Sequence, residues 1–110
     1  MDDSNFQMIS TAMLESLTEQ LEEHLGDDLE VEYTDGIVTI THDEGEFVIN
    51  AHLPTHQIWM SSPISGSTHF EFIQQSGRWR SIRPPHDYLR GLLASEISRM
   101  CDKTFIFDPV

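Results

Sequence analysis

The sequence predicts an α+β fold: a two-layer sandwich with two helices packed on one face of an antiparallel sheet of five to six strands. Segments with helical apolar spacing stand near both ends of the chain, and short alternating segments joined by brief turns fill the middle. Short connections favour an antiparallel meander, because parallel strands need long crossovers. Two helices with one apolar stripe each can cover the same face of that sheet. The opposite face is then open to solvent or to a partner.

The first helix is expected from about Ser4 to Leu25. Ser4 and Gln7 have the spacing of a capping box, and Gly26 is a plausible stop. One apolar stripe follows the helical period and consists of Phe6, Ile9, Met13, Leu14, Leu17, Leu21 and Leu25. The sequence therefore predicts an amphipathic helix that buries this stripe.

The middle of the chain predicts a run of strands separated by turn residues. Asp35-Gly36 is a strong hairpin signal between the first two strands. The expected strands cover residues 29–33, 37–42, 47–50, 57–61, 68–72 and 78–82. Pro84-Pro85 ends the last strand, and a second helix follows from about His86 to Cys101. We expect the tail, 104–110, to pack back through its two phenylalanines, and residues 1–110 to form a single domain.

Charge is distributed unevenly along the 110 residues, whose formal net charge is −13. Fourteen of the nineteen Asp and Glu residues lie within 1–46, and 1–77 contains no Lys or Arg. Such a negative field repels nucleic acids and anionic membranes, and it attracts cations and basic protein surfaces. An acidic nucleic-acid mimic is a further interpretation that rests on charge alone.

The single cysteine, Cys101, can form neither an intramolecular disulfide nor a thiolate metal cage, so a reducing compartment fits best. The N-terminal residues Met1 to Ser4 have neither a basic nor an apolar targeting segment. We therefore expect a bacterial cytoplasm, with the mitochondrial matrix as the alternative if a transit peptide has been removed.

The first candidate site is a set of eight carboxylates on the first helix, the turn after it and the first strand. They are Glu15, Glu19, Glu22, Glu23, Asp27, Asp28, Glu30 and Glu32, which we call the acidic ridge. Carboxylate oxygens suit hard cations, including iron when no softer ligand is present. Exposed carboxylates without a fixed cage predict weak, exchangeable binding at several positions. The alternative is a solvated face that keeps the protein soluble.

Histidines and catalytic motifs give weaker signals. His52 and His56 have the spacing of helical metal ligands, but Pro54 between them makes a helix unfavourable. His24 can add a nitrogen ligand to the acidic ridge, although a surface histidine without a role is the simpler interpretation. The sequence has no nucleophile elbow and no glycine-rich phosphate loop, so we assign no catalytic residue.

The second candidate site surrounds Trp59. If Ile58 and Met60 face the helices, then Gln57, Trp59 and Ser61 face outward. An outward tryptophan in mid-sheet is a suitable anchor for a protein partner. A register shifted by one residue would instead place Trp59 in the core, and the pattern alone does not decide between the two.

Several segments resemble the frataxin family. Val48-Ile49-Asn50 followed by Gln57 to Gly66 is similar to the family's signature strand and Ser-Pro turn. Asp35 to Ile40 resembles its central hairpin, Gly77-Arg78-Trp79 its late tryptophan strand, and Leu89 to Ile97 its C-terminal helix. The resemblance covers nearly the whole chain.

The resemblance implies an iron-binding accessory protein of iron–sulfur cluster assembly. Its implied partners are a cysteine desulfurase and an iron–sulfur scaffold protein, with the acidic ridge holding iron as loosely bound cargo. It implies partner contacts at Asn50, Gln57 and Trp59, a structural role for Trp79, and a monomer that can oligomerise with iron. The alternative function is a ferroxidase and iron-storage protein. A second alternative is a purely protein-binding regulator to which iron is incidental.

Two departures from the family bear on the partner. Ala51-His52 stands where many relatives have a Lys or Arg followed by Gln, and His69 stands where some have arginine. A histidine is largely neutral near pH 7, so this chain should bring less positive charge to the interface than those relatives.

Overall fold

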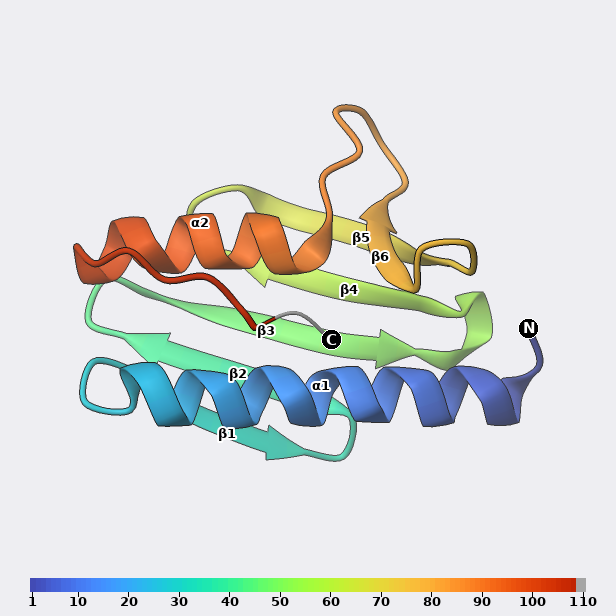
Figure 1. Cartoon of the computed structure of the whole chain (residues 1–110), viewed down its shortest axis with the longest axis horizontal. Helices are drawn as coiled ribbons and strands as arrows, with labels where there is room; N and C mark the ends of the chain where they lie inside the picture. Colours follow the sequence, from blue (N-terminus) through green and yellow to red (C-terminus); the bar gives the residue numbers. More distant parts are fainter. Residues whose placement is uncertain (109–110) are drawn as a thin grey trace.

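The chain folds into two layers, with helices α1 and α2 on one face of a six-stranded antiparallel sheet (Figure 1). This computed structural model describes residues 1–108. The strands lie in the order β1-β2-β3-β4-β5-β6, so each pairs with its neighbour in the sequence. The predicted two-layer α+β sandwich is confirmed. Within the described residues, neither helix combines the length and the apolar character that crossing a membrane requires.

Helix α1 (Asp3–Leu25) begins one residue before the predicted start. Asp2 is its N-cap, because Oδ1 of Asp2 accepts a hydrogen bond from the Asn5 N–H at 2.8 Å. The predicted capping box of Ser4 and Gln7 is therefore wrong, since Ser4 already lies inside the first turn. The buried stripe agrees with the predicted one except at Ile9, which is half-buried, and it adds Ser10.

All six predicted strands are present, with ends that differ by a few residues. They are β1 (Glu30–Thr34), β2 (Ile37–His42), β3 (Gly45–His52), β4 (Gln57–Ser62), β5 (Gly66–Ile73) and β6 (Arg78–Ser81). A short 3-10 helix, η1 (Leu53–Thr55), connects β3 to β4. The β1–β2 hairpin turns at Asp35 and Gly36, whose φ values of 52° and 77° are those of the expected primed turn.

Helix α2 (Leu89–Cys101) begins three residues later than the predicted His86. His86 has a left-handed φ of 58°, which no right-handed helix accepts. The chain has turned back by Tyr88, which is extended and forms an antiparallel bridge with Arg80 of β6 before α2 begins. The two prolines therefore end the strand, as predicted, but they do not start the helix.

The tail packs against α2 as predicted. The Ser98 hydroxyl both donates to the Phe105 carbonyl at 3.1 Å and accepts from the Phe105 N–H at 2.9 Å. Phe105 is buried and Phe107 is half-buried against the core. Residues 109 and 110, which the predicted tail also includes, lie outside the described part of the chain.

The core fills the space between the helices and the inner face of the sheet. Its largest fully buried side chains are Phe6, Phe47, Phe70, Leu14, Leu17, Leu21, Ile40, Ile49, Ile58, Met60, Leu89 and Leu93. Trp79 is also buried and meets the ring of Phe6 edge to face, with 6.0 Å between the ring centroids. Packing on the inner face fixes which side chains of each strand point outward.

Candidate functional site

Strand β4 presents Trp59 on the outer face of the sheet. Ile58 and Met60 are 0% and 2% exposed beneath the helices, whereas Trp59 between them is half-buried on the other side. The expected alternation is therefore confirmed, and the core interpretation of Trp59 is wrong. Trp59 pairs across the sheet with Asn50 of β3 and His69 of β5. One outward row thus crosses three strands.

Two histidines hold the indole ring between them. The imidazole of His52 stacks on one side of Trp59 with 3.7 Å between ring centroids, and His69 stacks on the other with 4.4 Å. The indole Nε1–H donates to Oε1 of Gln57 at 2.8 Å. His52 is itself restrained, because its Nδ1 lies 2.8 Å from the Thr55 hydroxyl of η1.

These contacts define a patch made of Asn50, His52, Gln57, Trp59 and His69, which we call the Trp59 patch. Its aromatic centre has little rotational freedom to lose when a partner docks, which lowers the entropic cost of binding. Beside it, Arg80 and Glu71 form an ion pair with 3.7 Å between Nη2 and Oε1. Glu71 pairs in register with Gln57, so the border of the patch is charged but locally balanced.

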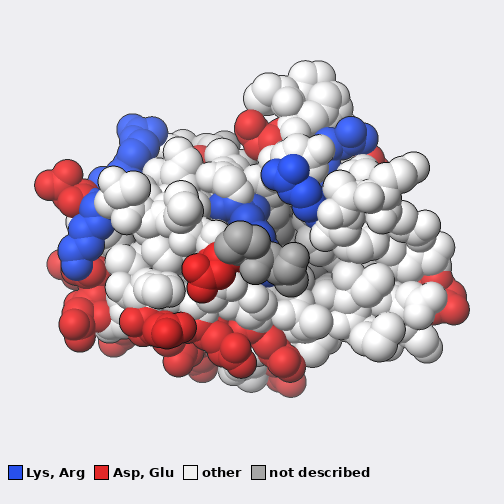
Figure 2. All heavy atoms as spheres, viewed as in Figure 1, with Lys and Arg blue, Asp and Glu red and all other residues white. Residues whose placement is uncertain are grey.

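The residues of the acidic ridge lie along one edge of the sandwich. The four glutamates of α1 are exposed, and so are Glu30 and Glu32 of the edge strand β1. Asp27 in the connecting turn is exposed, whereas Asp28 is half-buried. Figure 2 shows acidic side chains gathered in a band along the lower edge of the molecule, where α1 runs over β1.

Asp28 differs from the other ridge residues because its carboxylate forms an ion pair with a basic side chain. Its Oδ2 accepts a hydrogen bond from Nζ of Lys103 at 2.5 Å. The hydrogen bond and the charge of Asp28 raise the pKa of Lys103 above its usual value. Among the residues the structure describes, the other seven carboxylates form no ion pair. Those seven are therefore the ones open to a cation.

The ridge contains no preformed metal cage. Within residues 1–108, no group of three or more His, Cys, Asp or Glu side chains is arranged to hold a metal ion. Separated, exposed carboxylates can each give one or two oxygens to a cation while water supplies the rest. The arrangement suits a hard cation held loosely as cargo, and it does not suit a tightly held resident cofactor.

The remaining histidines are engaged in local contacts. His56 has a left-handed φ of 52°, so the helical spacing of His52 and His56 has no meaning here, as predicted. Its Nε2 lies 2.7 Å from Oδ1 of Asp3, and its ring stacks on Phe6. Nε2 of His24 lies 4.0 Å from Oδ2 of Asp108, and within residues 1–108 His24 belongs to no group of three or more side chains that could hold a metal ion.

Sequence reasoning missed the contribution of His52 and His69 to the Trp59 patch. In the sequence, His69 stands out only as a departure from the family pattern, and His52 as such a departure and as one member of an unfavourable metal-ligand pair. The alternation of β3, β4 and β5 places each residue on a face, but the pairing register is needed to set the two imidazoles against one indole. The sequence did contain an indication of this stack. His52 and His69 have flat rings that can stack on an indole, and they lie on the two strands expected to pair with the strand of Trp59.

Comparison with known proteins places this geometry in a family. The family model described as "Frataxin-like domain" matches residues 1–103. This chain belongs to the frataxin-like family. The resemblance seen in the signature strand and Ser-Pro turn is therefore confirmed.

Curated relatives of this frataxin-like chain include the mitochondrial frataxin homologue of Schizosaccharomyces pombe, which is 38% identical over 86% of this chain and 61% of its own length. The mitochondrial frataxin of Dictyostelium discoideum is 44% identical over 66% of this chain and 37% of its own length. The chain thus spans less than two thirds of the curated relatives that it matches.

Solved structures agree with the fold. Frataxin from Psychromonas ingrahamii covers 99% of this chain with a TM-score of 0.87 at 23% identity, which supports the fold alone. Trimeric frataxin from Saccharomyces cerevisiae has a TM-score of 0.77 at 31% identity, over 86% of this chain and 80% of its own. The same yeast protein, described as complexed with ferrous, has a TM-score of 0.69 at 30% identity, over 94% and 88%.

Proposed function

We propose that this frataxin-like chain is an iron-binding accessory protein of iron–sulfur cluster assembly. In this proposal it acts as an iron donor to, or a regulator of, a complex of cysteine desulfurase and scaffold protein. Residues 1–110 act as one domain that carries two separate surfaces. The acidic ridge holds iron, and the Trp59 patch contacts the partners through Asn50, Gln57 and Trp59.

The observation that carries the proposal is the outward, doubly stacked position of Trp59. A large aromatic side chain that the core does not use, and that two neighbours hold in place, is a suitable anchor for a protein interface. The class of partner, a cysteine desulfurase and its scaffold protein, is what the resemblance to frataxins implies, and the match to the frataxin-like family model supports that resemblance.

Loose iron binding is supported by the chemistry of the ridge and by a relative. Seven exposed carboxylates without a cage give affinity through charge, and they release their cargo easily. The yeast relative that is described as complexed with ferrous has the same fold. Iron delivered to a growing cluster must leave its carrier, so weak binding suits the proposed role.

The test is a reconstituted desulfurase–scaffold reaction titrated with this chain. Sulfide production and cluster formation are followed with ferrous iron present, and sulfide production is followed again under a strong chelator. A saturable change in rate supports the regulator role, and its persistence under chelator separates protein contact from iron supply. No change in either rate at saturating protein would contradict the proposal.

The second candidate function is a ferroxidase that stores iron in oligomers. The yeast relative, which is described as trimeric, supports this candidate because storage requires oligomers. Oxygen consumption by this chain with ferrous iron, measured together with its sedimentation, separates the two functions. Stoichiometric oxygen uptake and a shift to larger species would favour storage.

The compartment is part of the same proposal. The proposed compartment is a bacterial cytoplasm, whereas the curated relatives are named as mitochondrial proteins and support the alternative of the mitochondrial matrix. Fractionation of the source cells distinguishes the two compartments.

A further inference from the structure

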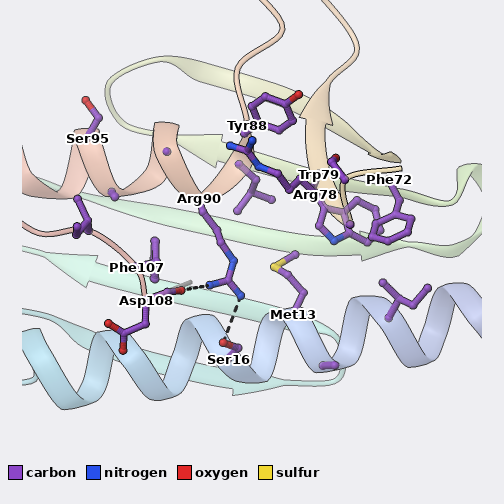
Figure 3. Close-up of a pocket in the computed structure, with 18 of the residues that line it drawn as sticks. Met13, Ser16, Phe72, Arg78, Trp79, Tyr88, Arg90, Ser95, Phe107 and Asp108 are labelled. Atoms are coloured by element: carbon purple, nitrogen blue, oxygen red, sulfur yellow. Dashed lines mark hydrogen bonds between the residues drawn. The ribbon is translucent and has the colours of Figure 1, made fainter. Parts of the chain in front are cut away.

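A large groove opens on the helical face of the molecule, far from the outer face of the sheet. It has a volume of about 830 Å³ and lies between α1, the first half of α2 and the C-terminal tail (Figure 3). Because α2 begins only at Leu89, it covers the sheet incompletely beside β6. Trp79 and Phe72 lie beneath the groove, and the tail closes one side of it with Phe107.

The walls of the groove are mainly apolar, and some of their side chains are unusually exposed. Met8 of α1 is 65% exposed and Ile106 of the tail is 78% exposed, and both line the groove. Met13 and Ala94 continue the apolar lining inward. The volume and lining are those of pockets that bury small organic ligands.

Two guanidinium groups project into this apolar space (Figure 3). Arg90 is half-buried, and burial lowers the pKa of its guanidinium, although it stays protonated at neutral pH. Its partners are weak: Nη2 donates to the Ser16 hydroxyl at 3.3 Å and Nη1 to the Asp108 carbonyl at 3.5 Å. Arg78 lies with its guanidinium carbon 3.7 Å from the centroid of the Tyr88 ring.

Neither arginine is neutralised by a carboxylate within the part of the chain that the structure describes. Asp108 also lines the groove, but its Oδ2 lies on the side of His24 at 4.0 Å. A partly desolvated cation without a counter-ion favours the binding of an anion.

We propose that this groove is a binding site for a single-chain amphiphile with a carboxylate head, such as a medium-chain fatty acid. The carboxylate binds the guanidinium of Arg90, with Arg78 adding a second positive charge, because guanidinium and carboxylate match in a bidentate geometry. The aliphatic chain extends from Arg90 past Met13 and over Trp79. This site is separate from the acidic ridge and the Trp59 patch.

The first experiment uses the fluorescence of Trp79 as a local reporter. The chain has two tryptophans, so a Trp59→Phe variant leaves only the one beneath the groove. Titration with decanoate below its micelle concentration should give a saturable change at one ligand per chain. Decyltrimethylammonium, which has the same tail and a cationic head, should give none. Equal binding of both amphiphiles, or no saturation with decanoate, would overturn the proposal.

The second experiment blocks the groove without weakening the fold. Gly91 lines the groove within α2, and an added Cβ there meets no atom within 4 Å. Gly91→Leu should abolish decanoate binding, because its side chain occupies the ligand's space. The matched control Gly91→Ala adds only a methyl group and should keep the affinity within about twofold. Both replace a helical glycine, so both should melt at or above the temperature of the parent chain.

Removal of the charge completes the test. Arg90→Gln should weaken decanoate binding by about tenfold, as expected for the loss of a charge-assisted hydrogen bond. Unchanged affinity in both Arg90→Gln and Gly91→Leu would show that decanoate binds elsewhere, and the proposal would fall. If Arg90→Gln does not fold, the Gly91 pair still decides the outcome.

Discussion

The indole ring of Trp59 and the imidazole of His69 lie face to face across β4 and β5, with 4.4 Å between ring centroids and 7° between ring planes. The stack lies on the solvent side of the sheet, so the core does not depend on it. Stacked aromatic pairs on a sheet contribute about 0.5–1.5 kcal/mol beyond their buried area. Trp59 is therefore available for a partner at little cost to folding.

The two tryptophans should separate function from stability. Trp59→Ala should remove the effect on the desulfurase–scaffold rate while lowering the free energy of unfolding by about 1 kcal/mol. Trp79→Ala should lower it by about 3–5 kcal/mol, because Trp79 is only 5% exposed in the core. Urea denaturation gives both values. A loss of more than about 3 kcal/mol for Trp59→Ala would mean that this ring supports the fold.

The carboxylates of the acidic ridge should favour iron binding and lower the stability of the fold. Replacing Glu15, Glu19, Glu22 and Glu23 with glutamine removes repulsion between carboxylates that lie one helical turn apart. The melting temperature should rise by about 2–5 °C, and the apparent dissociation constant for ferrous iron should increase. Calorimetry and an iron titration measure the two effects. A lower melting temperature would contradict the interpretation of the ridge as repulsive.

Asp28 supplies the matched control for the ridge. Asp28 is the ridge carboxylate that forms an ion pair with Lys103, so Asp28→Asn removes this ion pair as well as a negative charge. The melting temperature should fall, and iron binding should change less than in any single glutamate variant. If Asp28→Asn behaves like the glutamate variants, the ion pair with Lys103 does not contribute to stability in solution.

Local patterns were sufficient to predict most of the fold. The period of the apolar residues predicted both helices, and the alternation and turns predicted all six strands. The errors lie at helix starts, where neighbouring residues compete. Asp2 caps α1 in place of Ser4, and a bridge with Arg80 of β6 holds Tyr88 extended, outside α2. The late start of α2 thus depends on a contact that is made only in the folded chain.

The candidate site was predictable only in part, for a physical reason. The outward position of Trp59 follows from alternation once one neighbouring residue is known to be buried. The stack on His52 and His69 joins side chains of neighbouring strands, and the contact between Asp28 and Lys103 joins residues that are distant in sequence. Such contacts depend on register and on how the tail packs, which a single sequence does not contain.

The thiol of Cys101 should react slowly in the folded protein. Burial, and then the negative charge of Asp28, raise the pKa of this thiol, although Lys103 acts in the opposite direction. Less thiolate is therefore present at neutral pH than in the unfolded chain, so alkylation by iodoacetamide should speed up on adding urea. Because the pKa is higher in the folded state, this group's contribution to stability is lost as pH rises above about 8.5–9. Equal alkylation rates in the folded and unfolded chain would contradict the shift.

The buried carboxylate of Glu96 ties α2 to the turn that joins β4 and β5. Its Oε1 accepts hydrogen bonds from the hydroxyls of Ser62 at 2.6 Å and Ser65 at 3.1 Å. The Ser62 oxygen in turn accepts from the backbone N–H groups of Ile64 and Ser65. One carboxylate thus organises the whole Ser-Pro turn.

Glu96→Ala should lower the free energy of unfolding by about 2–3 kcal/mol, because it leaves the buried Ser62 hydroxyl without its acceptor. Ser65→Ala, which removes one hydrogen bond at an exposed residue, should cost about 0.5–1.5 kcal/mol. Because this turn sets the pairing of β4 with β5, Glu96→Ala should also weaken the rate effect attributed to the Trp59 patch, even at temperatures where the variant stays folded. Urea denaturation and the reconstituted assay measure the two effects. A destabilised variant with a fully retained rate effect would show that the patch holds its shape without the anchor.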